Sequence, residues 1–257
     1  MTDTEREPLA PHPTLPSYYD EDRERQRFVN DLFDRGSRHY DWVNRVMSLG
    51  SGYWYRGEVL RRAGLGPGMR VLDVATGTGA VAAVASEIVT ASGMVVGVDP
   101  SGGMLRQARQ NVKAHFVQAV GETLAIRGDT FDMLTMGYAL RHVSDLRAAF
   151  REYRRVLKPG GRLVIMEISV PRSRMGAALL RTYMGRLVPL VSRFGTRSRD
   201  TEEMMRYYWD TTASCVAPAV ILDALVDAGF ADVRREVRYG FLSEYRASRP
   251  DSPLRAE

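Results

Sequence analysis

The sequence predicts an α/β protein built on a doubly wound, mostly parallel sheet of seven strands. From residue 70 to residue 168, short apolar runs alternate with amphipathic stretches of helical length, which is the pattern of parallel strands with helices on both faces of the sheet. A glycine turn follows the first run, within the segment VLDVATGTGAV at 71–81, and the second run ends in a single acid, Asp99. In such sheets these strand ends meet at one edge, where ligands bind.

The composition is that of an ordinary globular protein. The chain has 257 residues, of which 44% are hydrophobic and 26% charged, enough to bury one large core. No apolar run approaches the ~20 residues that span a bilayer, and the N-terminus lacks the basic start and apolar core of a secretory signal. The single cysteine, Cys215, excludes an internal disulfide framework and a cysteine-rich metal site. We therefore expect a cytoplasmic protein.

Arginine carries almost all of the positive charge. The net charge is +5, and Lys113 and Lys158 are the only lysines. The arginines are scattered, with no basic stripe interleaved with aromatic residues, so we expect no nucleic-acid partner. One local cluster follows residue 171 and consists of Arg172, Arg174, Arg181, Arg186, Arg193, Arg197 and Arg199. It is either a solvated face or a contact surface for an anionic partner, such as a membrane or a phosphate.

The order of these features predicts one domain with a tail at each end. Residues 1–20 are polar and proline-rich, which is typical of a disordered tail. The domain is expected over 21–257. Within it, helices over 21–66 precede the sheet, a helical lid over 173–213 is inserted after the fifth strand, and residues 247–257 form a C-terminal tail.

The residues before the sheet show the apolar spacing of helices. One apolar face is centred on 28–33, and a second amphipathic stretch runs over 40–47 and stops at Gly50. A third stretch covers about 53–63. We expect this N-terminal part to be helical up to the glycine-rich loop that leads into the first strand.

The region that follows is expected to form the sheet and its covering helices. Its elements are strand 70–75, helix 79–90, strand 94–98, helix 102–113, strands 115–118 and 131–136, helix 144–157 and strand 162–168. Two helical stretches rich in Met, Tyr, Trp and Arg then form the lid. The chain closes with a helix over about 218–228 and two strands, 231–237 and 239–246.

The glycine turn is the first candidate for a ligand contact. The run 71–74 suits a buried strand, and Gly77 and Gly79 then let the backbone approach a ligand closely. A dinucleotide fingerprint would need a third glycine, where this chain has Ala82. The missing glycine disfavours a nicotinamide oxidoreductase, and a structural turn without a ligand remains an alternative.

The next two strand ends add contacts at the same edge. Asp99 lies 20 residues beyond Gly79, where a carboxylate can accept hydrogen bonds from both hydroxyls of a ribose. Its alternative role is to cap the helix that starts at Ser101. After the third strand, an adenine could lie against Val120 and accept a hydrogen bond from the backbone N–H of Gly121.

These segments resemble the class I S-adenosylmethionine-dependent methyltransferases, which implies a Rossmann-like fold. The shared segments are VLDVATGTG (71–79), VVGVDPSGGML (95–105), FDML (131–134) and VLKPGGRLVIME (156–167). More narrowly, the chain resembles the ubiquinone/menaquinone-biosynthesis C-methyltransferase family over about 28–246. The narrower match is carried by SRHYDWVNRVMSLG (37–50), YALRHVSD (138–145) and MEISVP (166–171).

The resemblance implies S-adenosylmethionine as the cofactor. The contacts that it implies are Asp73, Gly77, Gly79, Asp99 and the backbone of Val120 and Gly121. Further cofactor contacts are expected from Ala75, Pro100, Met104 and Glu122. Two departures stand out. The family often has Asp or Asn where this chain has Val120, so a side-chain contact to the adenine amino group is lost. It has Asn where this chain has His142, which affects the expected substrate because that position adjoins the proposed reaction centre.

Three residues are candidates for catalysis. Methyl transfer mainly requires a nucleophile held in line with the S–CH₃ bond, and removing a phenolic proton makes the neighbouring ring carbon more nucleophilic. His142 is the candidate base, since its ordinary pKa is near neutrality. Arg141 would steady the phenolate or orient a water, and the resemblance implies a substrate-polarising arginine at this position. Tyr40 would reach the same cavity. The alternatives are that His142 is a capping or surface residue and that Tyr40 is a core aromatic.

The lid is expected to bind a hydrophobic aromatic or prenylated substrate. The candidate substrate contacts are Tyr138, Met184, Tyr207, Tyr208 and Trp209. The alternative is that these Met and aromatic side chains only pack in the core. The four histidines show no ligand spacing with acidic neighbours, so we expect no metal site.

The functional hypotheses differ in the methyl acceptor and in whether catalysis occurs. The first is a C-methyltransferase acting on a hydroquinone such as demethylmenaquinol, peripheral at the inner face of the membrane and in contact with it through the arginine-rich lid. The second is a C- or O-methyltransferase of secondary metabolism acting on a polyketide, phenol or prenyl compound. The third is a non-methylating protein that binds the cofactor. A homodimer is a further expectation.

Overall fold

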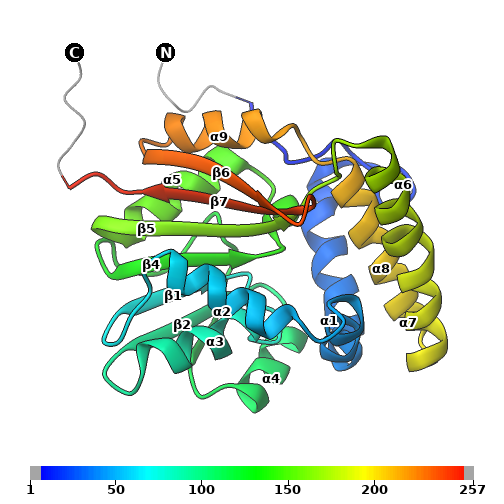
Figure 1. Cartoon of the computed structure of the whole chain (residues 1–257), viewed down its shortest axis with the longest axis horizontal. Coiled ribbons are helices and arrows are strands. Elements are labelled where there is room, and N and C mark those ends of the chain that lie inside the picture. The colour runs from blue at the N-terminus through cyan, green and yellow to red at the C-terminus, as the bar shows by residue number, and fades with distance from the viewer. Residues whose placement is uncertain (1–6, 252–257) are drawn as a thin grey trace.

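A seven-stranded sheet forms the centre of the molecule (Figure 1). The computed structural model describes residues 7–251, apart from the side chain of Asp22. The strands follow the spatial order β3-β2-β1-β4-β5-β7-β6, and β7 runs antiparallel to both β5 and β6. Their bounds are β1 Arg70–Val74, β2 Met94–Asp99, β3 His115–Gln118, β4 Phe131–Gly137, β5 Leu157–Ile168, β6 Ala231–Arg238 and β7 Leu242–Ser248. The predicted fold class is confirmed.

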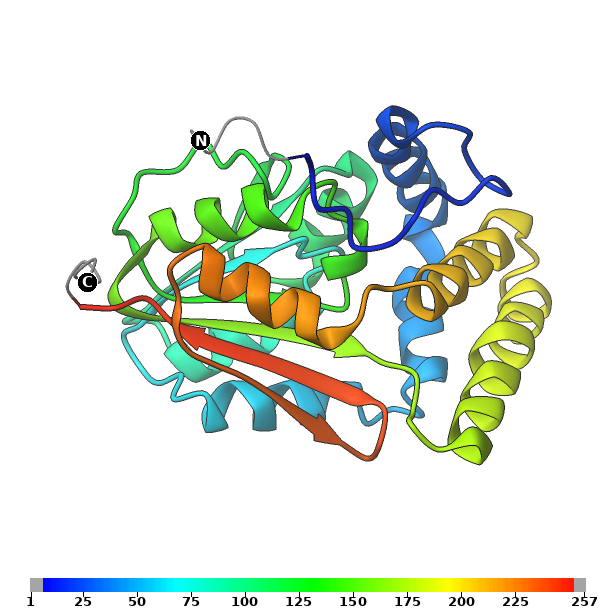
Figure 2. The same ribbon diagram turned by 90° about the horizontal axis from the view of Figure 1, so that it is seen from above.

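Helices cover both faces of the sheet and one of its ends. Their bounds are α1 Asp22–Met47, α2 Gly52–Arg62, α3 Ala80–Val89, α4 Gly102–Asn111, α5 Leu146–Val156, α6 Arg174–Thr182, α7 Val188–Thr196, α8 Arg199–Ala213 and α9 Pro218–Asp227. Helices α2 and α3 pack on one face, and α5 and α9 on the other (Figure 2). Because both faces are covered, the central strands read as continuous apolar runs.

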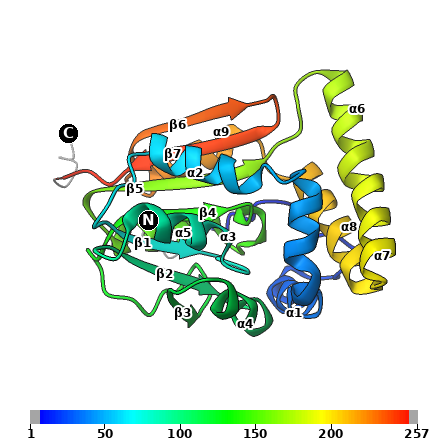
Figure 3. The ribbon, with the colours of Figure 1, turned by 60° about the horizontal axis from the view of Figure 1, so that its bottom comes forward.

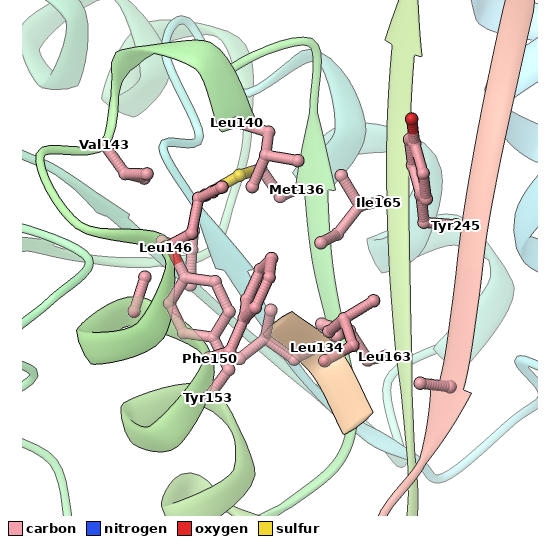
Figure 4. Close-up of a cluster of buried hydrophobic side chains, with 14 of the residues drawn as sticks. Leu134, Met136, Leu140, Val143, Leu146, Phe150, Tyr153, Leu163, Ile165 and Tyr245 are labelled. Atoms are coloured by element: carbon pink, nitrogen blue, oxygen red, sulfur yellow. The ribbon is translucent and has the colours of Figure 1, made fainter. Parts of the chain in front are cut away.

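Helix α5 packs one apolar face against the sheet. Leu146, Phe150 and Tyr153 recur at i, i+4 and i+7 and are fully buried against the sheet, where Leu134 and Ile165 lie (Figure 4). Burying each such side chain contributes about 1.5–3 kcal/mol. This packing fixes the loop before α5, which carries Arg141 and His142.

The first two predicted amphipathic stretches form one continuous helix. Helix α1 is 26 residues long and stands across the end of the sheet where β1, β2 and β4 finish (Figure 1). Helices α6 and α7 are joined by a π-helical segment, Tyr183–Leu187, and form the outermost layer. Figure 3 shows α1 and α8 between this layer and the sheet. A third core cluster fills the space between these helices.

The prediction of a disordered tail over 1–20 is wrong for residues 7–20. The N–H of Leu9 donates to Oδ1 of Asp145 at 3.0 Å, and the carbonyl of Pro11 accepts from the N–H of Val216 at 2.8 Å. Tyr19 is buried. Figure 2 shows this segment in dark blue, running from the sheet side to the start of α1. The prolines suggested disorder. However, proline also favours an ordered, extended segment, because it has no N–H group that needs a hydrogen-bond partner. Residues 1–6 lie outside the described part.

The predicted C-terminal tail over 247–257 also begins later than expected. Ala247 and Ser248 belong to β7 and pair with Leu163 and Arg162 of β5. The Arg249 side chain donates to the carbonyl of Arg154 at 3.1 Å. Residues 252–257 lie outside the described part.

Candidate active site

Among the described residues, two cavities at the end of the sheet that α1 covers hold most of the predicted site residues. The first is formed by the loops after β1, β2, β3 and β4. Of the predicted cofactor contacts, it is lined by Ala75, Gly77, Asp99, Pro100, Met104, Val120, Gly121 and Glu122. Tyr40, Tyr138 and His142 line it too. The strand ends therefore meet in one place, as expected of a doubly wound sheet.

The glycine turn is bound directly to the second strand end. Gly77 has a φ of +57°, in the left-handed region, and its N–H donates to Oδ2 of Asp99 at 2.8 Å. Oδ1 of Asp99 accepts the N–H of Ser101 at 2.9 Å. Each carboxylate oxygen keeps a further lone pair for a ligand. Burial raises the pKa of Asp99 from 3.8 to about 6, although these two hydrogen bonds lower it in part.

Asp73 and Gly79, also predicted as cofactor contacts, do not line the first cavity. Asp73 is fully buried and accepts hydrogen bonds from the hydroxyls of Thr76 at 2.6 Å and Thr135 at 2.7 Å, so it ties the turn to β4. Gly79 begins α3 with a φ of +86°, and a Cβ there would lie 2.9 Å from Cγ2 of Val112. The structure gives both residues a role in shaping the turn.

Two acids of α1 fasten that helix over the first cavity, and neither was predicted as a site residue from the sequence. Asp34 accepts the N–H of Gly103 at 2.7 Å, at the start of α4. Asp41 accepts the side-chain amide of Asn111 at 2.8 Å and the hydroxyl of Thr78. The two acids lie seven residues apart and therefore on one face of the helix, which was the available signal. The cavity volume is about 80 Å³, below the ~300 Å³ usual for a small-molecule site, and side chains of α1 form one of its walls.

The second cavity is larger and mostly apolar. Its volume is about 600 Å³, and it lies between the end of α1, the start of α2, helix α6 and the β6–β7 turn. Among the predicted substrate contacts, Tyr138, Met184 and Tyr208 line it, whereas Tyr207 and Trp209 do not. Successive residues of a helix point about 100° apart, so only Tyr208 of these three neighbours faces the cavity. Tyr207 instead packs edge-on against Tyr18.

Tyr138 separates the two cavities and lines both. It follows β4 directly and has a φ of +63°, a strained conformation for a residue with a side chain. Its N–H donates to the carbonyl of Met166 at 2.7 Å. Arg56 was not predicted as a site residue from the sequence. It lines the second cavity, with its guanidinium 5.5 Å from the centre of the Tyr138 ring.

Arg141 lines neither cavity. Its guanidinium is buried, donates to Oε2 of Glu167 and to the carbonyl of Tyr138, both at 2.7 Å, and lies 3.8 Å from the centre of the Tyr208 ring. Nε donates to the hydroxyl of Thr211 at 3.1 Å. Arg141 therefore contacts two of the tyrosines that line the second cavity, Tyr138 and Tyr208.

His142 lines the first cavity and not the second. Its ring stacks on Tyr207 at 5.6 Å and meets Phe33 edge-on at 5.1 Å. Both ring nitrogens are buried and have no hydrogen-bond partner within residues 7–251. Burial, together with the charge of Arg141, lowers the pKa of His142 well below its usual value, so the imidazole is neutral at pH 7. Tyr40 lies in the same cavity, and burial raises its pKa.

The described residues contain neither a metal-binding cluster nor a single helix that could span a membrane. Within 7–251, no group of three or more His, Cys, Asp or Glu side chains is arranged to hold a metal ion. In the same part of the chain, no single helix has the length and apolar character needed to cross a membrane. Helices α8 and α9 meet that test only when taken together across a bend of 78°.

Comparison with known proteins identifies the family. The model of the ubiE/COQ5 methyltransferase family matches residues 20–243. The chain is 36% identical over 227 residues to the demethylmenaquinone methyltransferase of Mycolicibacterium paratuberculosis, covering 87% of this chain and 95% of that one. It is 32% identical over 212 residues to the ubiquinone/menaquinone biosynthesis C-methyltransferase UbiE of Shewanella frigidimarina, covering 80% and 83%.

Solved structures agree with the fold. A SAM-dependent methyltransferase from Thermotoga maritima aligns with a TM-score of 0.61 at 20% identity, over 86% of this chain and 99% of that one. Phosphoethanolamine N-methyltransferase 2 of Haemonchus contortus, in complex with S-adenosyl-L-methionine, aligns with a TM-score of 0.62 at 18% identity, over 88% and 60%. The predicted enzyme class and cofactor are confirmed: the chain belongs to the ubiE/COQ5 methyltransferase family and is an S-adenosylmethionine-dependent methyltransferase.

Proposed function

We propose that this enzyme methylates a ring carbon of a prenylated hydroquinone, such as demethylmenaquinol, in menaquinone biosynthesis. The observation that carries the proposal is the second cavity, whose volume of about 600 Å³ and apolar lining suit an aromatic ring with a prenyl tail. The names of the relatives from Mycolicibacterium and Shewanella support the same acceptor class.

The residues of the first cavity fit S-adenosylmethionine. Asp99 would accept the ribose hydroxyls, and the Val120–Gly121 segment would lie along the adenine. When bound, the cofactor supplies an activated methyl group. Tyr138 borders both cavities, and we propose that it sets the approach of the acceptor ring.

We propose that Arg56 stabilises the negative charge on the quinol oxygen. It is a cation in the lining of the second cavity, and its Nε is buried without a hydrogen-bond partner in the described residues. A preorganised donor aimed at developing charge is among the strongest catalytic devices. Asn44 lines the same cavity and offers a second donor. In this scheme Arg141 acts as a positioning residue, through Tyr138 and Tyr208.

The catalytic role expected for His142 remains a hypothesis. A neutral imidazole can accept a proton, which keeps the base hypothesis testable. However, the ring lines the first cavity only, and this position favours a contact with the cofactor. We therefore propose that His142 offers its free ring nitrogens to the cofactor, where Val120 has no polar side chain to offer.

The test of the proposed function is methyl transfer itself. The purified protein is incubated with methyl-labelled S-adenosylmethionine and a panel of reduced naphthoquinones, benzoquinols, simple phenols and polyketides. We expect a C-methylated prenyl naphthoquinol as the preferred product. An O-methylated phenol or polyketide would favour an enzyme of secondary metabolism, and no labelled product from any acceptor would contradict both.

A further inference from the structure

The outer surface of α6 and α7 is basic and has no acidic residue. Between Glu167 and Asp200 the chain contains no Asp or Glu. Seven arginines in this segment are all exposed, and they are Arg172, Arg174, Arg181, Arg186, Arg193, Arg197 and Arg199. The stretch therefore presents a single sign of charge, which attracts an anionic surface.

These arginines are largely unpaired. Within residues 7–251, Arg193 is the only one of the seven that forms an ion pair, with Glu202 at 3.4 Å. Some exposed arginines elsewhere are paired, as Arg155 is with Glu152 at 2.6 Å and Arg35 with Asp200 at 3.2 Å. The six unpaired guanidinium groups lack an anionic partner inside the described molecule.

Large apolar side chains are exposed on the same helices. Met175 is 76% exposed, Leu179 66% and Phe194 72%, and Leu187 and Leu190 are about half exposed. Isolated exposed apolar residues are ordinary, but five on one continuous helical segment form a patch that indicates an interaction. Arginines with apolar side chains among them are the composition of a helix that lies in a membrane interface.

The patch continues to the mouth of the second cavity. Leu179 belongs to the patch and lines that cavity. The other side of the lining includes Leu49, which is 85% exposed, and Tyr239, which is 68% exposed. Helices α6 and α7 form the outermost layer at this end of the molecule (Figure 3), so no described element covers the patch.

We propose that the outer face of α6 and α7, with Leu49 and Tyr239 at the cavity mouth, docks on an anionic lipid bilayer. The unpaired arginines bind the lipid headgroups, and the exposed apolar side chains enter the interface between them. The second cavity then opens toward the membrane, from which a lipid-soluble acceptor enters. The docking proposal depends only on the residues of this surface. The entry of a prenylated acceptor from the membrane also rests on the proposed function.

The test measures binding of the full chain to vesicles by flotation. The vesicles contain phosphatidylcholine, either alone or with phosphatidylglycerol. We expect binding only to the anionic vesicles and its loss at high salt. Each basic residue contributes about fivefold to such partitioning, so the triple variant R174Q/R181Q/R186Q should bind about 10²-fold more weakly.

A matched control distinguishes the effect of this surface on vesicle binding from the effect of net charge. R106Q/R109Q/R127Q removes the same charge from exposed arginines on α4 and before β4, and it should bind like the wild type. F194S should weaken binding without a change in charge. Equal loss in both triple variants, or no binding to anionic vesicles, would overturn the docking. A dimer in solution that F194S dissociates would instead show that a second copy of the chain covers the patch.

An activity measurement keeps this proposal distinct from the proposed function. The triple variant should methylate a water-soluble short-chain quinol at the wild-type rate and a long-chain quinol in anionic vesicles more slowly. Equal rates on the long-chain quinol would contradict entry from the membrane. Failure of the wild type on both quinols would contradict the proposed acceptor and leave the vesicle-binding result to decide the docking.

Discussion

The N–H of Gly77 donates a hydrogen bond to the carboxylate of Asp99 at 2.8 Å. This bond joins the end of β1 to the end of β2, so the residue that would hold the ribose also holds the glycine turn. A substitution at Asp99 therefore affects both the ligand and the shape of the turn.

We expect Asp99→Ala to weaken S-adenosylhomocysteine binding by about 10²-fold, because hydrogen bonds to a charged group contribute about 1.5–3 kcal/mol. Isothermal titration measures the change. A thermal melt of the same variant shows whether it is folded. Binding equal to the wild type in a folded Asp99→Ala protein would remove Asp99 from the ribose site.

Binding should also depend on pH. Burial raises the pKa of Asp99 to about 6, and only the ionised carboxylate accepts hydrogen bonds at both oxygens. We therefore expect constant affinity for S-adenosylhomocysteine above about pH 7 and a Kd that rises by up to about tenfold per pH unit below pH 6. In Asp99→Asn the same titration should be flat over this range. A flat wild-type profile would contradict the prediction.

The two glycines of the turn should respond differently to alanine. Gly77 has a positive φ and open space, since its nearest side-chain atom would lie 3.9 Å from a Cβ, so Gly77→Ala should cost about 1–2 kcal/mol. Gly79→Ala would introduce a similar backbone strain and also a 2.9 Å contact between the new Cβ and Val112, so it should lower the free energy of unfolding by more. Urea unfolding of both variants gives the comparison, and an equal or smaller loss for Gly79→Ala would contradict it.

The proposed role of Arg56 predicts a loss of rate without a loss of cofactor. We expect Arg56→Gln to lower kcat by about 10²-fold, as removal of one preorganised donor does, with S-adenosylhomocysteine binding unchanged. Arg61→Gln is the matched control, because Arg61 lies on the same helix, is exposed and does not line the cavity. Full activity in Arg56→Gln would exclude the role.

The role of His142 can be assigned by measuring KM for S-adenosylmethionine and kcat separately. If it contacts the cofactor, His142→Ala should raise KM for S-adenosylmethionine and change kcat little. A general base would give the reverse, with kcat reduced by about 10²–10⁴-fold. His142→Asn, which restores the residue expected from the family, should retain more cofactor affinity than His142→Ala under our proposal.

Local patterns predicted the sheet and the strand-end residues that line the first cavity, because the signal for each lies in neighbouring residues. The apolar run, the glycines and Asp99 each lie within a few positions of a strand end. Asp34 and Gly103 are joined across 69 positions, and no local pattern connects them. Arg56 resembled an ordinary charge on a helix until the fold placed it beside Tyr138.

The same limit applies to the predicted substrate contacts on the lid. Tyr207, Tyr208 and Trp209 form an aromatic cluster in the sequence, yet α8 turns only Tyr208 toward the second cavity. Helical periodicity predicts that such neighbours diverge, but it does not predict which of them faces the cavity. That choice depends on where α8 packs against α1.

Helix α1 has a consequence for the order of events in turnover. One rigid helix is fastened over the first cavity by Asp34 and Asp41 and lines the second with Asn44 and Met47. Any displacement of α1 that admits the cofactor would also disturb the second cavity. We therefore expect a compulsory sequence in which the cofactor enters first and its spent form leaves last, and a bound acceptor should slow the exchange of S-adenosylhomocysteine.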